Sequence, residues 1–85
     1  MARLARKPGT IRVVVGERIR RERERQNLSQ EEVAFASDMS LRHLGNIERG
    51  VSNTSIEQLA RIAHALGVQP SELIPSLDDA GLPIA

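Results

Sequence analysis

Residues 28–50 read LSQEEVAFASDMSLRHLGNIERG, and this stretch decides the fold because it carries two helix starts and a helix stop. Ser29 followed three residues later by Glu32 is a capping box, which predicts that a helix begins at the next residue. Ser40 is typical of a second N-cap, and Gly50 of the left-handed residue that ends the helix opened there. We therefore expect two helices and a bend between them, over residues 30–37, 41–49 and 38–39.

Small and apolar residues mark one side of both expected helices. They recur at helical spacing, with Val33, Ala34 and Ser37 in the first helix and Leu44 and Ile47 in the second. Small Ala34 permits the two helices to cross closely, because a larger side chain would push them apart. A pair of short helices joined by a tight turn is a unit that presents its second helix to the major groove of DNA.

A longer helix is expected before this pair, from residue 11 or 14 to residue 26. Its inward stripe consists of Val15, Ile19 and Arg23. Asn27 suits the left-handed residue that ends such a helix.

A fourth helix is expected after the loop at residues 51–53. Either Thr54 with Glu57 or Ser55 with Gln58 forms its capping box. Its predicted buried face consists of Ile56, Leu59, Ile62, Ala63 and Leu66.

Gly67 ends that helix, and Pro70 suits the first position of a fifth helix over residues 70–74. The predicted fold class is all-α: a compact bundle of five short helices without β-alternation. We expect a flexible basic N-terminal arm, one helical domain and a C-terminal tail, over residues 1–10, 11–75 and 76–85.

The composition bounds the class of protein. Eighty-five residues make one small domain, and with Phe35 as the single aromatic residue the core must consist of Leu, Ile, Val and Ala. Such a core has marginal stability, which dimerisation would raise. There is no cysteine for a disulfide or a thiolate metal site, and no apolar run approaches the ~20 residues of a membrane span. The N-terminus is basic but lacks the apolar stretch of a secretory signal, so we expect a soluble cytoplasmic protein without metal or cofactor.

Charge is distributed unevenly along the chain. Residues 1–26 carry nine basic and three acidic side chains, whereas residues 27–85 carry three and eight, so the net charge of +1 conceals a basic segment. This distribution permits a basic surface that attracts nucleic acid. The arginines and glutamates of residues 17–25 also have a simpler interpretation, a solvated helix with i,i+4 pairs such as Glu17 with Arg21.

Several motifs follow one another along residues 15–74. They read LSQEEVA at 28–34, MS at 39–40, IERG at 47–50, SIEQL at 55–59, IA at 62–63, ALGV at 65–68 and SEL at 71–73. In this order they resemble the Cro and lambda-repressor-like helix-turn-helix family, often called Xre-type. The resemblance implies a lambda-repressor-like DNA-binding domain, and restriction-modification controllers and phage-type repressors are small members with this layout.

Four positions depart from the family pattern. Asp38 stands where glycine is usual, which is tolerable because aspartate enters the left-handed region more easily than most residues. Glu22 replaces an apolar residue of the first helix. His43 replaces a common tyrosine and Gly45 a polar residue, and both changes affect the expected DNA contacts rather than the fold.

The helix predicted over residues 41–49 is about 13 Å long, which suits a major groove about 12 Å wide. Leu44 and Ile47 anchor its back. The opposite face presents Leu41, Arg42, Gly45, Asn46 and Arg49. Arg42 is the candidate for base reading, because its guanidinium fork matches guanine O6 and N7.

The other residues of this helix have narrower roles. Leu41 offers an apolar contact to a thymine methyl, Asn46 reaches an adenine edge or a phosphate, and Arg49 adds charge. Gly45 either permits close approach of the backbone to DNA or marks a tolerant exposed site. His43 either hydrogen-bonds a phosphate or packs on the preceding helix.

Phosphates are expected where helix N-termini present free N–H groups. The resemblance implies that the Gln30 side chain clamps the DNA backbone. Ser40 is a cap and a candidate phosphate donor, and the loop along the other strand consists of Ser52, Asn53 and Thr54. The simpler interpretation of Gln30, Ser40 and Thr54 is helix capping, with which a phosphate contact is compatible.

Glu48 is unexpected on a helix that faces DNA. We therefore expect it to turn inward toward Arg23, a pairing that the family pattern also supports. Such a partly buried ion pair would tie the first helix to the third, and removing one partner would leave an uncompensated charge.

The function favoured by these features is a sequence-specific transcriptional regulator that binds a near-palindromic operator in double-stranded DNA as a homodimer. Its half-sites would lie about 34 Å apart. The candidate dimer interface consists of Leu73, Ile74 and Leu77. Leu82 and Ile84 are further apolar residues that could extend it. Alternatively, these residues complete the monomer core.

The alternative function is a protein-interaction module, such as an antitoxin or a helix-turn-helix adaptor with a protein partner. Phe35 favours it, as an aromatic residue at a usually outward position, although packing against Val13 or Val14 is the preferred interpretation. An enzyme is disfavoured, because the only histidines are His43 and His64, and the carboxylates mostly alternate with arginines on an exposed helix.

Overall fold

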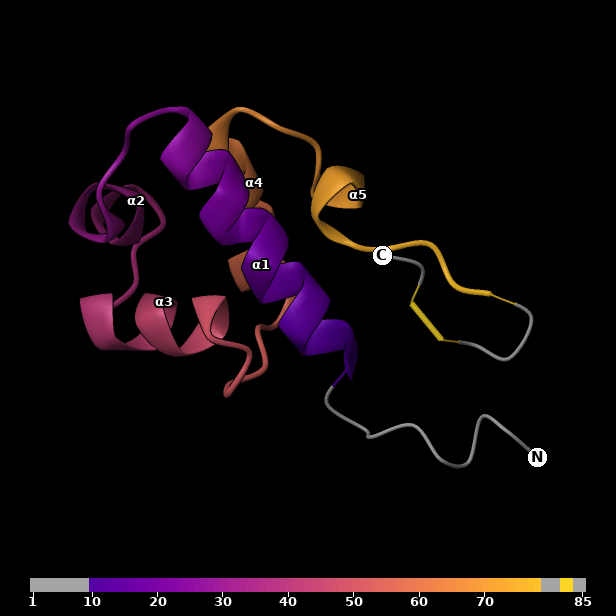
Figure 1. Cartoon of the computed structure of the whole chain (residues 1–85). Coiled ribbons are helices and arrows are strands. Elements are labelled where there is room, and N and C mark those ends of the chain that lie inside the picture. Colours follow the sequence, from indigo (N-terminus) through magenta and orange to yellow (C-terminus); the bar gives the residue numbers. More distant parts are fainter. Residues whose placement is uncertain (1–9, 79–81, 84–85) are drawn as a thin grey trace.

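The computed structural model describes residues 10–78 and 82–83, and these residues form five helices (Figure 1). The helices are α1 (Thr10–Arg25), α2 (Gln30–Ala36), α3 (Leu41–Glu48), α4 (Ile56–Leu66) and α5 (Pro70–Leu73). The predicted all-α bundle is confirmed. Residues 1–9 of the expected arm and Ile84 lie outside the described residues. None of these five helices combines the length and the apolar character that a membrane span requires.

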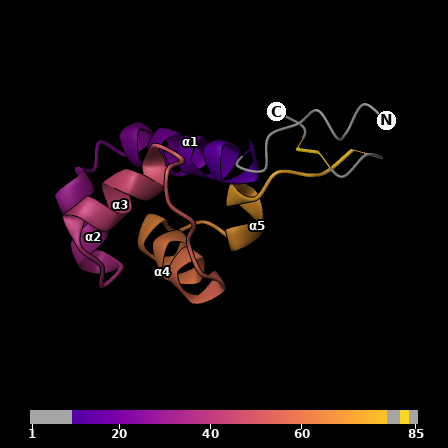
Figure 2. The same cartoon turned by 90° about the horizontal axis from the view of Figure 1, so that it is seen from below.

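Helix α1 lies across the other helices (Figures 1 and 2). It packs against α3, α4 and α5, while α2 packs against both α3 and α4. In Figure 1, α2 and α3 lie on one side of α1, and α5 lies on the other side. The support behind α3 therefore comes from α1 on one side and α2 on the other.

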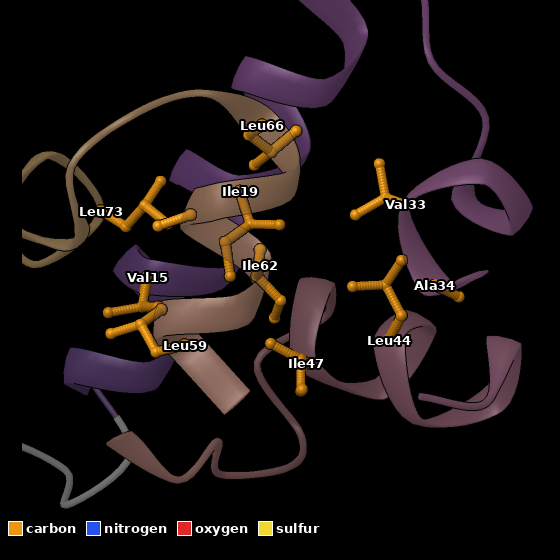
Figure 3. Packing of buried hydrophobic residues seen from close by; sticks show 11 residues of the cluster. Val15, Ile19, Val33, Ala34, Leu44, Ile47, Leu59, Ile62, Leu66 and Leu73 are labelled. Atoms are coloured by element: carbon orange, nitrogen blue, oxygen red, sulfur yellow. The ribbon is translucent and has the colours of Figure 1, made fainter. Parts of the chain in front are cut away.

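The core consists of aliphatic side chains from all five helices (Figure 3). Its members are Val15, Ile19, Val33, Ala34, Leu44, Ile47, Leu59, Ile62, Ala63, Leu66 and Leu73. Figure 3 shows Ile19 of α1 and Ile62 of α4 near the middle of this cluster. The apolar residues predicted to face inward from α2 and α3 all belong to it, so the helical spacing identified the correct faces.

Side-chain caps begin α2 and α3 as predicted. Ser29 Oγ accepts the Glu32 N–H at 3.0 Å, and the Glu32 carboxylate accepts the Ser29 N–H at 2.8 Å. Ser40 Oγ accepts the His43 N–H at 3.0 Å. The left-handed residues are also those expected from the sequence, Asn27, Asp38, Gly50 and Gly67.

Helix α4 begins with one of its two predicted capping boxes, but its first turn is more exposed than predicted. Ser55 and Gln58 form the capping box, and the Thr54 hydroxyl instead donates to the carbonyl oxygen of Ser55 at 3.3 Å. Ile56, predicted to be buried, is 87% exposed. The first turn of α4 extends beyond the core, which this helix joins only at Leu59.

Helices α1, α2 and α3 each end one residue before the predicted end, and two further boundaries also differ. Helix α1 begins at Thr10, so one residue assigned to the arm is helical. Helix α5 ends at Leu73, and Ile74 is extended rather than helical. The reason is Pro75, because a residue that precedes proline is disfavoured in the helical region.

The segment after Pro75 has local order that its lack of period did not predict. Leu77 and Pro83 form an isolated antiparallel bridge. The Asp78 N–H donates to the Leu82 carbonyl oxygen at 2.8 Å, and the Leu82 N–H donates to Asp78 Oδ1 at 2.9 Å. These two hydrogen bonds between Asp78 and Leu82 accompany the bridge.

Gly16 allows α1 and α3 to approach each other closely. A Cβ at this position would lie 2.3 Å from the carbonyl oxygen of Ile47 and 2.8 Å from that of Glu48. Any other residue would therefore force α3 to move. A glycine inside a helical pattern is itself a signal of close packing, but Gly16 was not singled out from the sequence.

Ser37 is fully buried, and its hydroxyl has no hydrogen-bond partner within the described part of the chain. We expect Ser37→Ala to leave the free energy of unfolding unchanged or to raise it by about 1 kcal/mol, because it removes an unsatisfied polar group. Urea denaturation measures this change. A loss of more than about 1 kcal/mol would show that the hydroxyl is hydrogen-bonded in the protein.

Glu22 helps to connect the end of α1 to α4. Its carboxylate accepts hydrogen bonds from Arg25 and, at 2.7 Å, from Gln26 Nε2. Gln26 Nε2 also donates to the carbonyl oxygen of Leu66 at 2.7 Å. The hydrogen bond from Arg25, followed by that from Gln26, lowers the pKa of Glu22 below its ordinary value.

We expect Glu22 to make the fold sensitive to acid. A carboxyl whose pKa is lowered by folding stabilises the protein above its ordinary pKa, and that contribution is lost as the pH falls through the lowered value. Between about pH 6 and pH 2.5, the free energy of unfolding should therefore fall more in the wild type than in Glu22→Gln. Urea denaturation at several pH values measures both slopes, and equal slopes would contradict the expectation.

Candidate nucleic-acid interface

Helix α3 has an anchored back and an open front. Leu44 and Ile47 are buried in the core behind it. The front carries exposed or half-buried side chains, which we call the outward face: Leu41, Arg42, Asn46 and Arg49. These four residues were all predicted on this side.

A shielded ion pair connects α3 to α1. Arg23 Nε donates to Glu48 Oε2 at 2.8 Å, and Arg23 Nη2 donates to Glu48 Oε1 at 3.0 Å. The Glu48 side chain is 1% exposed and that of Arg23 12%. The hydrogen bonds to Glu48 raise the pKa of Arg23 and so favour its charged form. The inward turn expected of Glu48 is therefore present.

Helix α2 joins the same cluster through Gln30. Gln30 Nε2 donates to Glu48 Oε1 at 2.9 Å. Arg23 Nη1 donates to the carbonyl oxygen of Leu28, just before α2, at 2.8 Å. Three helices thus meet at one carboxylate, and Gln30 has a partner that sequence reasoning did not assign to it.

Gly45 is buried, so its interpretation as a tolerant exposed site is wrong, whereas close approach of the backbone to DNA stays a prediction. A Cβ at Gly45 would lie 3.3 Å from Arg49 Nη1 and 3.9 Å from Gln30 Nε2. The Arg49 guanidinium in turn donates to the side-chain oxygen of Asn46. Two polar side chains therefore lie over this glycine.

His43 contacts α4, a neighbour that neither sequence interpretation of this residue included. Its Nε2 lies 3.3 Å from Oε1 of Gln58. Gln58 is placed there by its capping box, in which Oε1 also accepts the Ser55 N–H at 3.1 Å. The contact could not be read from α3 alone, because it depends on how α4 approaches.

Ser40 and the loop at residues 52–54 lie at the two ends of α3. Ser40 is exposed at its N-terminus, and Asn53 is exposed in the loop. The Ser52 N–H donates to the carbonyl oxygen of Asn46 at 3.3 Å, which ties the loop to the end of α3. Ser52 and Thr54 are half-buried.

The three dimer candidates lie in different environments. Leu73 is 2% exposed and belongs to the core, so it is not available to a second chain. Ile74 and Leu77 are exposed. Leu73 is the last residue of α5 and packs with the other helices, whereas the backbone of Ile74 is extended.

Phe35 is 90% exposed, so its predicted packing against Val13 or Val14 is wrong. Helix α2 turns Val33 to the core and leaves Phe35 in solvent. Val13 lies instead beside Gly50, where a Cβ would approach the Val13 Cα to 2.8 Å.

Residues 19–73, from α1 to the end of α5, match the helix-turn-helix family HTH_3. The chain therefore belongs to the Xre-type helix-turn-helix family. This is a family of DNA-binding regulators and not of enzymes.

Similar proteins include regulators of two kinds. The chain is 40% identical over 65 residues to control protein C.BamHI of Bacillus amyloliquefaciens, covering 75% of this chain and 80% of that one. It is 36% identical over 62 residues to an immunity repressor protein of Bacillus phage phi105, covering 73% of this chain and 43% of the repressor. The crystal structure of the restriction-modification controller protein C.AhdI from Aeromonas hydrophila has a TM-score of 0.71 and 39% identity, covering 73% of this chain and 94% of that one. The family resemblance inferred from the sequence is confirmed.

Proposed function

We propose that the chain is a sequence-specific transcriptional regulator that binds a near-palindromic operator as a homodimer, with α3 in the major groove. The outward face of α3 carries this proposal. It is open to solvent, includes the exposed arginines Arg42 and Arg49, and is braced from behind by buried Leu44 and Ile47. A helix with such a face reads base edges when it lies in the groove.

The outward face supplies the proposed base contacts. Arg42, in the first turn of α3, would read guanine, and Leu41 beside it would contact a thymine methyl. Asn46 and Arg49, which bond each other, would reach an adenine edge or a phosphate. Gly45 would permit close approach of the α3 backbone to DNA. The proposed phosphate contacts are Gln30, Ser40, His43, Ser52, Asn53 and Thr54.

Dimerisation is proposed through the exposed apolar surface around α5. Ile74 and Leu77 belong to this surface, and Ile11 joins Ile74 in lining a hollow of about 360 Å³. Arg18 of α1 holds α5 and the residue that follows it in place. Its Nη1 donates to the carbonyl oxygens of Glu72 at 3.3 Å and Ile74 at 3.4 Å. One short helix reads only a few base pairs, so two-fold pairing would double the contact.

Selection of random duplexes with the purified protein tests the proposal. We expect one enriched motif with two-fold symmetry and half-sites about 34 Å apart. Affinity for that motif should fall steeply as salt rises, because bound phosphates release counterions. Absence of any enriched motif would overturn the regulator, and sedimentation of a monomer on an asymmetric motif would overturn the homodimer.

Arg42→Ala is expected to cost about 1–3 kcal/mol of binding free energy and to relax base preference at one position of each half-site. Arg20→Ala is the matched control, because Arg20 is an exposed arginine of α1 that forms only a loose ion pair, with Glu24 at 3.9 Å. It removes the same charge without removing a base reader. Binding arrays of both variants measure the effect, and unaltered preference in Arg42→Ala would remove this residue from the readout.

A second candidate function, a protein-interaction module, is favoured by the exposure of Phe35. Exposed Glu31, Glu32 and Asp38 accompany it, so a partner surface there would be basic and apolar. Retention on the selected duplex at low salt separates the two functions. A protein partner that co-purifies while no duplex is retained would favour the interaction module.

A further inference from the structure

We propose that Glu48 is a positioning residue for DNA binding, and that it acts through the side-chain amide of Gln30. The inference rests on the proposed function and adds to it a residue that would not itself reach DNA. Glu48 ends α3, yet its carboxylate is 1% exposed and is bonded to α1 and α2. It is therefore a link between the elements that would surround the DNA backbone.

One carboxylate oxygen receives hydrogen bonds from two helices. Glu48 Oε1 accepts Arg23 Nη2 at 3.0 Å and Gln30 Nε2 at 2.9 Å. The other oxygen, Oε2, accepts Arg23 Nε at 2.8 Å. Arg23 neutralises the buried charge, so the carboxylate serves Gln30 as a fixed acceptor rather than as a free anion near a phosphate.

The bond to Glu48 leaves Gln30 with a directed donor. A glutamine amide has two N–H donors and one acceptor, and Glu48 occupies one of the donors. Gln30 Nε2 also lies 3.9 Å from the position of a Cβ on Gly45, so the amide lies over α3. A side chain that is ordered before binding loses less conformational entropy when the complex with DNA forms. The second N–H is thus held beside the outward face, where a phosphate would approach.

A purely structural role for Glu48 makes a different prediction. If the carboxylate only joins α1 to α3 through Arg23, its removal would weaken DNA binding by the same factor with or without the Gln30 side chain. If it positions Gln30, the loss disappears once that side chain is removed. The coupling between the two residues therefore separates the roles.

The test is a double-mutant cycle on DNA affinity. The wild type, Glu48→Gln, Gln30→Ala and the double variant are titrated with the selected duplex at a temperature where circular dichroism shows each to be folded. In Glu48→Gln, an NH₂ group at the Oε1 position faces donors of Arg23 and Gln30, whereas one at the Oε2 position faces Arg23 Nε alone, so the amide exchange of Gln30 described below shows whether its acceptor is lost. We expect each single change to weaken binding about tenfold, the worth of a hydrogen bond to a charged group. In the Gln30→Ala background, Glu48→Gln should change affinity less than about twofold.

Glu22→Gln is the matched control. It removes another hydrogen-bonded, partly shielded carboxylate, which accepts Gln26 Nε2 at 2.7 Å near the end of α1. Its effect on affinity should be the same with and without the Gln30 side chain. Comparable coupling in this control would mean that general loosening of the fold explains the cycle, and would overturn the proposal.

A second variant and a second measurement keep the proposal testable if Glu48→Gln does not fold. Glu48→Asp keeps the charge that Arg23 requires but withdraws the carboxylate by one methylene, and it should show the same coupling. Nuclear magnetic resonance of the Gln30 side-chain amide needs no DNA: its protons should exchange slowly in the wild type and rapidly in both Glu48 variants. Additive losses, or unchanged exchange, would overturn the proposal. If the wild type bound no selected duplex, the proposed function would fail instead, and exchange would still decide whether Glu48 positions Gln30.

Discussion

Replacing Glu48 by alanine is expected to lower the free energy of unfolding by about 3–5 kcal/mol, because the change strips a shielded arginine of its partner. Arg23, whose side chain is 12% exposed, would lose both hydrogen bonds to the carboxylate. Gln30 would lose its acceptor as well. A small domain has only about 5–15 kcal/mol of stability, so the loss should be visible as a large fall in melting temperature.

Glu24→Ala is the control for this change. The Glu24 side chain is 59% exposed and lies 3.9 Å from Arg20 and 4.0 Å from Arg23, so its loss should cost less than about 1 kcal/mol. Replacing Arg23 and Glu48 together by methionine should recover much of the stability, because no unpaired charge then remains. An unchanged melting temperature in Glu48→Ala would contradict the role assigned to the pair.

Gly16→Ala is expected to destabilise the fold by about 3 kcal/mol, although alanine favours a helix more than glycine does. The added Cβ would lie 2.3 Å from the carbonyl oxygen of Ile47 and 2.8 Å from that of Glu48. Both atoms are backbone and cannot rotate away, so α3 itself must shift. Thermal denaturation measures the loss, and the titration with the selected duplex should show weaker binding.

Gly67→Ala is the control for Gly16→Ala, because it also replaces a glycine but introduces no steric clash. Gly67 has a φ of 72°, but a Cβ there would have nothing within 4 Å. The substitution therefore adds only the strain of the left-handed region, about 1 kcal/mol. If Gly16→Ala were as stable as the wild type, α1 and α3 would not be in the close contact described.

Local interactions explain why so much of the fold could be predicted. The caps at Ser29 and Ser40 involve a side chain and a backbone N–H three residues apart, so sequence spacing alone specifies them. The inward faces of α2 and α3 follow from the same helical period. Ile56 shows where prediction from periodicity fails. Periodicity identifies the residues that share one face of a helix, but not the part of that face that the other helices leave uncovered.

The candidate site was predicted less completely, because its contacts cross between helices. Arg42 and Leu41 were placed on the correct side of α3 by their spacing from Leu44. The bonds of Glu48 to Gln30 and of His43 to Gln58 join residues 18 and 15 positions apart and depend on how the helices cross. A family pattern favoured the pairing of Arg23 with Glu48, but no pattern indicated that Gln30 also bonds Glu48.

By itself, the sequence determined the starts of α2 and α3, the family and the anchored side of α3, because these depend on residues within one or two helical turns. Only the tertiary structure decided that Gly45 lies beneath two polar side chains, that Leu73 is in the core while Ile74 is outside it, and that one carboxylate joins three helices. The physical reason is that such contacts are set by the distances and crossing angles between helices. Spacing along a single chain does not specify those quantities.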